Sequence, residues 1–530
     1  MKAQAVSAAV FAAACLSGLA VSEPAWHDLA ITAPRHGRYL HRTASEDAFF
    51  WQADTAWEML HRLNKTSIDF YLRSRAEQGF NVVQTVLVSE LNGTTRPNFY
   101  GDLPFNNSDP TQPNEEYFEL VDWASELAAS YGILLALVPT WGMYVSGGYH
   151  DTESIFNESS AQQWGQYIGA RYPGLPKILG GDTDTKWVRN IEDALAGTTS
   201  DEMMSLMDPI EDTTDIWKSM YAGLVEAERE QGYDSVIIYH PAVLWFMRPE
   251  ETSVAYGHNM LPEEEYRVSI DAVQSGHSVI TPNSSINVYE YFDSTKNYEC
   301  IAGMRDGFSG PVVDLENHYE GCHVGFDVTK MMWNASHIRT GLYHGVYGGS
   351  AGFTYGANSV WQMYEPRSDL LRDSDYYAAQ IGQNVSGSWR KDLAFEGATQ
   401  IQYVTQPLQG LDTLTLEQLE PARGLLGSIN GSNDTAVNLY EGTQYISVLA
   451  SLQRDHYYVY TGHGDSFSLD LGSISGARDG TARWFSPRNG QYCNETSVAI
   501  PAYGSGDTRV DFTPPSSGGV DNDWLLEVEF

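Results

Sequence analysis

Between residues 49 and 355, short runs of apolar residues alternate with longer segments in which apolar residues recur every three or four positions. The short runs predict strands, and the longer periodic segments predict amphipathic helices. The predicted strands cover residues 49–54, 82–88, 133–138, 177–182, 236–240, 268–277, 312–316 and 351–355. The predicted helices include residues 66–78, 117–131, 161–170, 214–230 and 328–342. Continuously apolar strands separated by helices are typical of a parallel sheet that helices cover. Eight such units in roughly 350 residues predict a TIM (β/α)8 barrel, an α/β fold.

Beyond about residue 406 the pattern changes to short strands separated by turns rich in Gly, Asp, Asn and Pro. These strands cover residues 445–452, 456–460, 467–471, 481–485, 509–512 and 524–530. This pattern predicts a small all-β sandwich. A chain of 530 residues is also long for a single core. We therefore expect a barrel domain over residues 21–406 and a β-sandwich domain over residues 407–530.

The fourth and the seventh predicted barrel strands both end in a carboxylate. The fourth strand ends at Asp182, and the seventh ends at Glu316. Barrel enzymes carry their chemistry at the C-terminal ends of the strands, so the two side chains are expected to share one site. A pair of carboxylic groups, one protonating the leaving oxygen and one attacking or activating water, suggests hydrolysis of a glycosidic bond.

Other polar and aromatic residues also lie at predicted strand ends and are expected to line the same mouth. They are Asp54, Glu90, Trp141, Tyr239, His240, His277, Tyr319 and Tyr355. We expect Asp54 and the histidines to hold sugar hydroxyls or orient the carboxylates, and Trp141 to stack on a sugar ring. A structural hydrogen bond is the alternative for each of them. Asp314, two residues before Glu316, is expected to share its strand face but to lie deeper.

Charge and composition limit the classes of molecule that this protein is expected to bind. The formal net charge is −38 and the pI is about 4.5, which disfavours nucleic acid and anionic membranes as partners. Hydrophobic residues make up 42% of the chain, so a folded protein is expected. An oligo- or polysaccharide substrate fits this composition, and a monomer is assumed.

The N-terminus predicts export. Lys2 precedes an apolar run over residues 5–21 and small residues near Ala20, which is the layout of a secretory signal peptide over residues 1–20. Acceptor tripeptides for N-glycosylation begin at Asn64, Asn92, Asn106, Asn157, Asn283, Asn334, Asn384, Asn430, Asn433 and Asn494. Together these features predict a secreted, extracellular glycoprotein.

Three cysteines remain after removal of the signal peptide. Cys300 and Cys322 are expected to form a disulfide, because this pairing closes a short loop beside the proposed site. Cys493 is then free or paired elsewhere.

Two other kinds of chemistry lack support in the sequence. Residues 348–352 match the G-x-S-x-G pattern, but they follow a helix and enter a strand, whereas a nucleophile elbow requires a strand and then a helix. The chain has no H-E-x-x-H motif and no paired C-x-x-C motifs, so neither a metal nor another cofactor is predicted.

Several short motifs carry a family resemblance. They are residues 52–57 (QADTAW), 77–82 (EQGFNV), 139–142 (PTWG), 180–182 (GGD), 239–241 (YHP), 274–277 (QSGH), 314–316 (DLE) and 355–358 (YGAN). Over residues 29–406 the chain resembles the apiosidase-like glycoside hydrolase family. Residues 484–490 (WFSPRNG) and the closing strand that starts at Asp523 are similar to the module called a putative collagen-binding domain, for which a supporting role is expected.

The resemblance implies that Asp182 is the acid/base and Glu316 the nucleophile of a retaining, exo-acting enzyme on pectic side chains of plant cell walls. Many retaining barrel hydrolases end the fourth strand in Asn-Glu, whereas this chain has Gly-Asp, so Asp184 is the alternative acid. Asp184 is otherwise expected to face solvent or to cap the next segment. The alternatives for the whole protein are another furanosidase, a pectic glycanase, or a non-catalytic protein that only binds carbohydrate or matrix.

Overall fold

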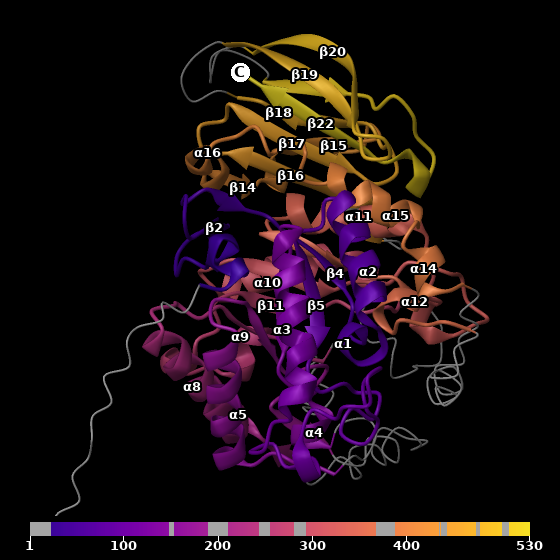
Figure 1. Ribbon diagram of the computed structural model, residues 1–530. Coiled ribbons are helices and arrows are strands. Elements are labelled where there is room, and N and C mark those ends of the chain that lie inside the picture. The colour runs from indigo at the N-terminus through magenta and orange to yellow at the C-terminus, as the bar shows by residue number, and fades with distance from the viewer. Residues whose placement is uncertain are drawn as a thin grey trace, which may run out of the picture.

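The computed structural model describes residues 23–147, 153–188, 210–242, 255–279, 293–366, 387–433, 435, 442–472, 478–500 and 508–530. The predicted signal peptide and the acceptor residues Asn283 and Asn384 lie outside the described residues. The α/β part of the chain occupies the lower part of Figure 1, and a β-rich C-terminal part lies above it.

Six parallel strands form one sheet in the α/β part, and two more form a second parallel sheet. In the order of pairing, the large sheet contains β10 (Ile237–Tyr239), β7 (Lys177–Leu179), β6 (Leu134–Val138), β5 (Val82–Val86), β4 (Trp51–Thr55) and β13 (Gly352–Tyr355). The second sheet pairs β11 (Asp271–Gln274) with β12 (Val312–Glu316). All eight strands predicted from the apolar runs are present, and their residues are buried as the lack of alternation indicates.

The two sheets meet at both edges. On one side, Ile238 of β10 forms a parallel bridge with Ile270, the residue before β11. On the other side, the Ala351 amide before β13 donates to the Val312 carbonyl of β12 at 2.9 Å. Between these edges, the Gln84 amide of β5 donates to the Leu315 carbonyl of β12 at 3.2 Å. The second sheet therefore lies beside both ends of the first and also faces its β5 strand.

Helices follow the strands as predicted. The longer ones are α2 (Lys65–Glu77), α3 (Glu115–Ser130), α5 (Glu158–Arg171), α8 (Thr214–Glu230), α10 (Asn297–Gly307) and α11 (Ala335–Tyr347). The shorter ones are α1 (Met59–Arg62), α4 (Met143–Ser146), α9 (Gly257–Met260), α12 (Asn358–Trp361), α14 (Trp389–Asp392), α15 (Glu396–Gln400) and α16 (Thr413–Glu417). In the part of the chain that the structure describes, no helix combines the length and the apolar character that crossing a bilayer requires.

Helix α11 starts seven residues later than the sequence pattern predicts, at Ala335 rather than at residue 328. Asn334 caps it by accepting from the amides of Ser336 and His337. The preceding residues instead form a hairpin-like loop, in which His323 pairs with Met332. The apolar residues of this loop continue the helical spacing of α11 toward the N-terminus, so the sequence pattern predicts an earlier start of the helix.

Short antiparallel strands complete the α/β part. They are β1 (Ile31–Thr32), β2 (Leu40–Arg42) and β3 (Ala48–Phe49) in one sheet, and β8 (Lys186–Val188) and β9 (Ile210–Asp212) in another.

The C-terminal part contains two antiparallel sheets. The larger has the order β14 (Leu419–Pro421), β16 (Ile446–Ser451), β17 (His456–Thr461), β22 (Trp524–Glu529), β19 (Arg478–Ser486) and β20 (Gln491–Ile500). The smaller has the order β15 (Leu426–Ile429), β18 (Phe467–Asp470) and β21 (Arg509–Phe512). Apolar residues of both sheets, such as Val459, Leu469 and Trp484, share one core. The sequence pattern did not predict β14, β15 or β20.

This C-terminal module is continuous with the α/β part. The other face of its larger sheet places Leu449, Tyr458, Phe485 and Leu525 in the same hydrophobic cluster as the strands and helices of the α/β part. Figure 1 shows α11 and α15 directly beneath this sheet. A shared core of this kind holds the two parts in a fixed arrangement.

The predicted disulfide is not formed. Cys300 and Cys322 are buried thiols, and no bridge is present among the described residues. Cys300 lies on α10 near Asp314, in the middle of β12, and this carboxylate contributes to a raised thiol pKa after the larger effect of burial. Cys322 lies in the loop beyond the end of β12, with its thiol directed at the His323 carbonyl. The two residues are close in sequence but lie at different levels along β12.

Candidate active site

A tight glycine-rich turn places Asp182 at the end of β7. Gly180, Gly181 and Asp182 all have positive φ angles, of 94°, 55° and 57°. A Cβ atom on Gly180 would lie 2.3 Å from the His240 carbonyl, and one on Gly181 would lie 3.1 Å from the Trp141 backbone. The two glycines therefore allow the turn to lie against the chain that follows β10 and β6. Asp182 itself adopts a left-handed conformation, which is uncommon outside glycine and is often found at functional sites.

A β-bulge directs Glu316 toward the same place. Val273 pairs with Asp314 and Gln274 pairs with Glu316, so Leu315 is an extra residue on β12. A bulge of this kind changes the direction of the side chains that follow it. Asp314 consequently accepts hydrogen bonds from the Ser275 hydroxyl at 2.7 Å and from Asn297 of α10 at 3.3 Å. The expectation that Asp314 shares the face of Glu316 is wrong.

Asp182, His240 and Glu316 form a compact group. Nδ1 of His240 lies 3.4 Å from Oδ1 of Asp182, and its Nε2 lies 3.4 Å from Oε2 of Glu316. One oxygen of each carboxylate and a ring nitrogen of His240 all lie within 4.8 Å of one another. The Asp182 side chain is 24% exposed, whereas those of His240 and Glu316 are 1% and 5% exposed. Asp182 is therefore the partly exposed member of the group, and Glu316 is enclosed.

His277 is the second imidazole at Glu316. Its Nε2 lies 2.8 Å from Oε1 of Glu316. The ring packs against Tyr319, with 4.4 Å between centroids, and against Phe326 at 5.0 Å. His240 and His277 thus contact different oxygens of the Glu316 carboxylate.

The two carboxylates have opposite pKa shifts. Burial, and then the negative charge of Glu316, raise the pKa of Asp182 to about 7. Burial alone would raise the pKa of Glu316, but hydrogen bonds from His240 and His277 outweigh it and lower that pKa. The contact with Glu316 and the charges of both carboxylates in turn raise the pKa of His240 against the effect of its burial. A protonated acid beside an ionised carboxylate is the arrangement that acid–base chemistry requires.

Aromatic residues form a wall beside this group. Trp141 packs edge-to-face on Trp57, with ring centroids 5.5 Å apart, and Trp57 packs in the same way on His240 at 5.9 Å. Tyr319 lies near Glu316 and Asp182, whose charges add to the effect of burial in raising its phenol pKa. Trp141, His240, His277 and Tyr319 are thus brought together as the strand-end positions predict.

Two residues of the site were not among the predicted site residues. Trp57 follows the end of β4, and Gln274 lies at the end of β11, where its side chain counteracts the rise in the pKa of Asp182. Both residues belong to motifs that carry the family resemblance, residues 52–57 and 274–277. Their positions at strand ends are the signal in the sequence that could have identified them as site residues.

Four predicted residues lie elsewhere. Asp54 is fully buried behind β4, where it pairs with Arg75 at 2.6 Å and accepts from Tyr71 at 2.5 Å, both of α2. Tyr355 donates to Glu320 at 2.7 Å and also packs against Arg75. The structure therefore does not bring Asp54 or Tyr355 to the two carboxylates, because both side chains point toward helices.

Tyr239 and Glu90, the other two, lie outside the group formed by Asp182, His240 and Glu316. The Tyr239 hydroxyl donates to the Thr183 carbonyl at 3.1 Å, and its ring lies against Gly180, so it supports the turn that carries Asp182. Glu90 is buried in the loop that follows β5.

Asp184 is fully buried and accepts from the Ala242 amide at 3.2 Å. Of the two expectations for Asp184, exposure to solvent is wrong because the side chain is buried, and its bond to the Ala242 amide holds the chain after β10. Asp182, and not Asp184, shares the group with His240 and Glu316.

Among the described residues, Asp182, His240 and Glu316 are also the one group with ligand atoms close enough together to hold a metal ion.

Comparison with known proteins now assigns the family. Residues 34–415 match the family model described as "Apiosidase-like, catalytic domain". The chain belongs to the apiosidase-like glycoside hydrolases. This confirms the resemblance read from the motifs, and both Asp182 and Glu316 lie within the matched region of this glycoside hydrolase. Residues 434–529 match a second model, described as "Putative collagen-binding domain of a collagenase".

Solved structures share the fold of this apiosidase-like chain over nearly its whole length. One, named a glycoside hydrolase, has a TM-score of 0.72 and 20% identity, with 96% of this chain and 98% of the other covered. A glycoside hydrolase family 5 protein from Bacteroides vulgatus ATCC 8482 has a TM-score of 0.73 and 22% identity, with 96% and 95% covered. At these identities the likeness concerns the fold alone. No curated protein matches the sequence significantly.

Proposed function

We propose that this apiosidase-like glycoside hydrolase is a secreted, retaining and exo-acting enzyme that removes sugar side chains from pectic polysaccharide. The observation that carries the proposal is that Asp182 and Glu316 meet beside His240, with one oxygen of each carboxylate within 4.8 Å of the other. Retaining glycosidases hold their carboxyl groups about 5–5.5 Å apart, whereas inverting enzymes need about 6.5–9.5 Å to admit a water molecule. The short separation supports a retaining mechanism.

The proposed roles follow from the environments of the two carboxylates. Glu316 is kept ionised by His240 and His277 and attacks the anomeric carbon, forming a covalent glycosyl-enzyme. Asp182 carries a proton up to about pH 7 and donates it to the leaving oxygen. Once the leaving group has departed, Asp182 is ionised and can take a proton from the water that releases the sugar. The partial exposure of Asp182 supports an approach of the substrate from this side.

We also infer that the two parallel sheets form one closed eight-stranded barrel. The Ile238–Ile270 bridge and the Ala351–Val312 hydrogen bond join the sheets at opposite edges. In a closed barrel the strand ends gather at one face, which supports the common location of Asp182, His240, His277 and Glu316.

Substrate choice rests on family membership. Trp57 and Trp141 are buried beside His240, at 3% and 4% exposure, and supply apolar surroundings for the two carboxylates. Side chains of apiose-containing pectin are the first substrates to test. Another furanosidase or a pectic glycanase activity is an alternative outcome of the same test.

Secretion is supported by the positions of the acceptor asparagines. Each of the eight that the structure describes is exposed or partly exposed, as attachment of a glycan requires. The signal-peptide pattern at residues 1–20 agrees with this proposal.

The test is a screen of the purified protein against pectic oligosaccharides, with the released sugar identified. Glu316→Gln keeps the size of the side chain and removes its charge, so it is expected to bind substrate and to lack turnover. Full activity of this variant would exclude Glu316 as nucleophile. Binding without hydrolysis by the wild-type protein would instead favour a non-catalytic carbohydrate-binding role.

A further inference from the structure

The loop after the catalytic strand β12 is joined to the chain after β13. The Glu320 amide donates to the Gly356 carbonyl at 2.9 Å, and the Asn358 amide donates to the Glu320 carbonyl at 2.9 Å. The Tyr319 ring lies so close to Gly356 that a Cβ atom there would be 2.1 Å from the ring. Because Tyr319 neighbours Glu316 and Asp182, the backbone at Glu320 sets the position of a group at the reaction centre.

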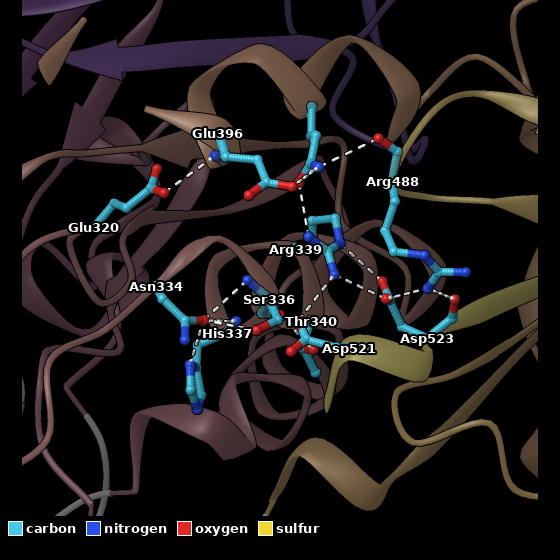
Figure 2. Close-up of polar contacts among 12 residues, drawn as sticks. Glu320, Asn334, Ser336, His337, Arg339, Thr340, Glu396, Arg488, Asp521 and Asp523 are labelled. Atoms are coloured by element: carbon cyan, nitrogen blue, oxygen red, sulfur yellow. Dashed lines mark hydrogen bonds and ion pairs between the residues drawn. The ribbon is translucent and has the colours of Figure 1, made fainter. Parts of the chain in front are cut away.

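The Glu320 side chain extends this connection away from the site. It is buried, its Oε2 accepts from the Tyr355 hydroxyl at 2.7 Å, and its Oε1 accepts from the Gly397 amide of α15 at 3.1 Å. The fit is close, since a Cβ atom on Gly397 would lie 2.5 Å from Oε2 of Glu320. Figure 2 shows the Glu320 carboxylate directed at the start of α15.

Helix α15 is in turn joined to the C-terminal module. Gln400, at its last position, accepts from Arg339 of α11 at 2.7 Å and donates to the Arg488 carbonyl of the module at 3.2 Å. Arg339 binds the Asp523 carboxylate through two nitrogens, at 3.0 and 2.9 Å. Arg488 reaches the same carboxylate at 2.7 Å. Figure 2 shows Asp523 between the two arginines, and its side chain is fully buried.

We propose that the C-terminal module is a positioning element of the active site, acting through Asp523, α15 and the positioning residue Glu320. The proposal rests on the proposed function, since the site it positions is the glycosidase site. Charged bidentate pairs hold tighter geometry than single hydrogen bonds. The chain of contacts runs from Asp523 through Arg339 and Gln400 to α15, and from Gly397 through Glu320 to Tyr319. It gives the module a role in the catalytic domain itself, in addition to any binding that the name of its family suggests.

A single methyl group tests the link at Gly397. Gly397→Ala must displace the Glu320 carboxylate, while alanine favours the helix more than glycine does. Because misplacement of a site by about 1 Å can cost about 100-fold in rate, we expect kcat to fall by at least about 10-fold with KM changed less than about twofold. Gly410→Ala is the matched control, since its Cβ meets no atom within 4 Å, and it should keep the wild-type kcat.

Asp523→Asn tests the link at the module. We expect a lower kcat. We also expect faster amide hydrogen exchange in the peptide that contains residues 319 and 320, because the Glu320 amide donates to the Gly356 carbonyl in the intact protein. The matched control is Glu420→Gln. It breaks the ion pair between Glu420 of the module and Arg305 of α10, which joins the module to the α/β part without involving α15. This control should retain the wild-type kcat and exchange rate.

The outcomes separate a positioning role from a purely stabilising one. A fall in melting temperature for Asp523→Asn, with kcat and exchange at residues 319–320 unchanged, would overturn the proposal. Equal losses of kcat in Asp523→Asn and Glu420→Gln would also overturn it, because the effect would not depend on α15. If the wild-type protein has no activity that Glu316→Gln abolishes, the proposed function fails, and the exchange measurement alone decides whether module and loop are coupled.

Discussion

His277 holds Glu316 through a 2.8 Å contact between its Nε2 and Oε1 of the carboxylate. The contact stabilises the ionised form of Glu316 and is one reason for its lowered pKa. A nucleophilic carboxylate must be ionised in the pH range where the acid is still protonated. In the proposed mechanism, this pair therefore sets the acidic limit of activity.

Replacing His277 by Leu should raise the pKa of Glu316, because a hydrogen bond to the charged form is lost. Such a bond contributes about 1.5–3 kcal/mol, so the acidic limb of the pH profile of kcat/KM should move upward by about 1 to 2 pH units. His277→Gln keeps a donor and should move it less. An unchanged limb in His277→Leu would contradict this role for His277.

The basic limb should belong to Asp182. Its pKa is raised to about 7, so the acid is protonated below this pH and loses its proton above it. Activity on natural substrates is therefore expected to be maximal below pH 7 and to fall as the pH rises through it. The measurement is kcat/KM between pH 3 and 9. Activity that still increases above pH 8 would show that Asp182 does not act as the acid.

Leaving-group dependence distinguishes Asp182 from Asp184. Asp182→Ala should slow substrates with poor leaving groups far more than activated aryl glycosides, because only the former need protonation. Asp184→Ala should slow both to a similar extent and lower stability, since it leaves the Ala242 amide without its acceptor. The reverse pattern would assign the acid to Asp184.

Asp54 should matter for stability. Asp54→Asn removes the charge that compensates the fully buried Arg75, and breaking a buried pair of this kind costs about 3–5 kcal/mol. A clearly lower melting temperature is expected, with KM close to wild type. The control is Asp212→Asn, whose exposed pair with Lys186 contributes at most about 1 kcal/mol. A large rise in KM for Asp54→Asn without a change in melting temperature would place Asp54 in the substrate site.

The sequence predicts the strands of the α/β part and the meeting of Asp182 with Glu316 because both depend on local signals. Apolar runs mark buried strands, and Asp182 and Glu316 follow directly from where those runs end. Side-chain direction at a strand end is less local. The extra residue at Leu315 separates Asp314 from Glu316, and nothing in the residue types around it announces a bulge.

Long-range contacts account for the other differences. Asp54 and Tyr355 point away from the two carboxylates because their partners, Arg75 of α2 and Glu320 of the loop after β12, come from other parts of the chain. The Cys300–Cys322 pairing fails because short separation in sequence does not place the two residues at the same level of β12. Strands β14, β15 and β20 lack a clear apolar alternation, and their partners in the module define them.

In the proposed mechanism, Glu316 forms a covalent glycosyl-enzyme with Asp182 as its acid/base partner. Once the released sugar is known, its activated 2-deoxy-2-fluoro glycoside can be incubated with the enzyme, and the labelled peptide identified by mass spectrometry. We predict a single label on Glu316, absent in Glu316→Gln, and a first product with the same anomeric configuration as the substrate. A label on another residue, or an unlabelled enzyme that releases a product of inverted configuration, would contradict it.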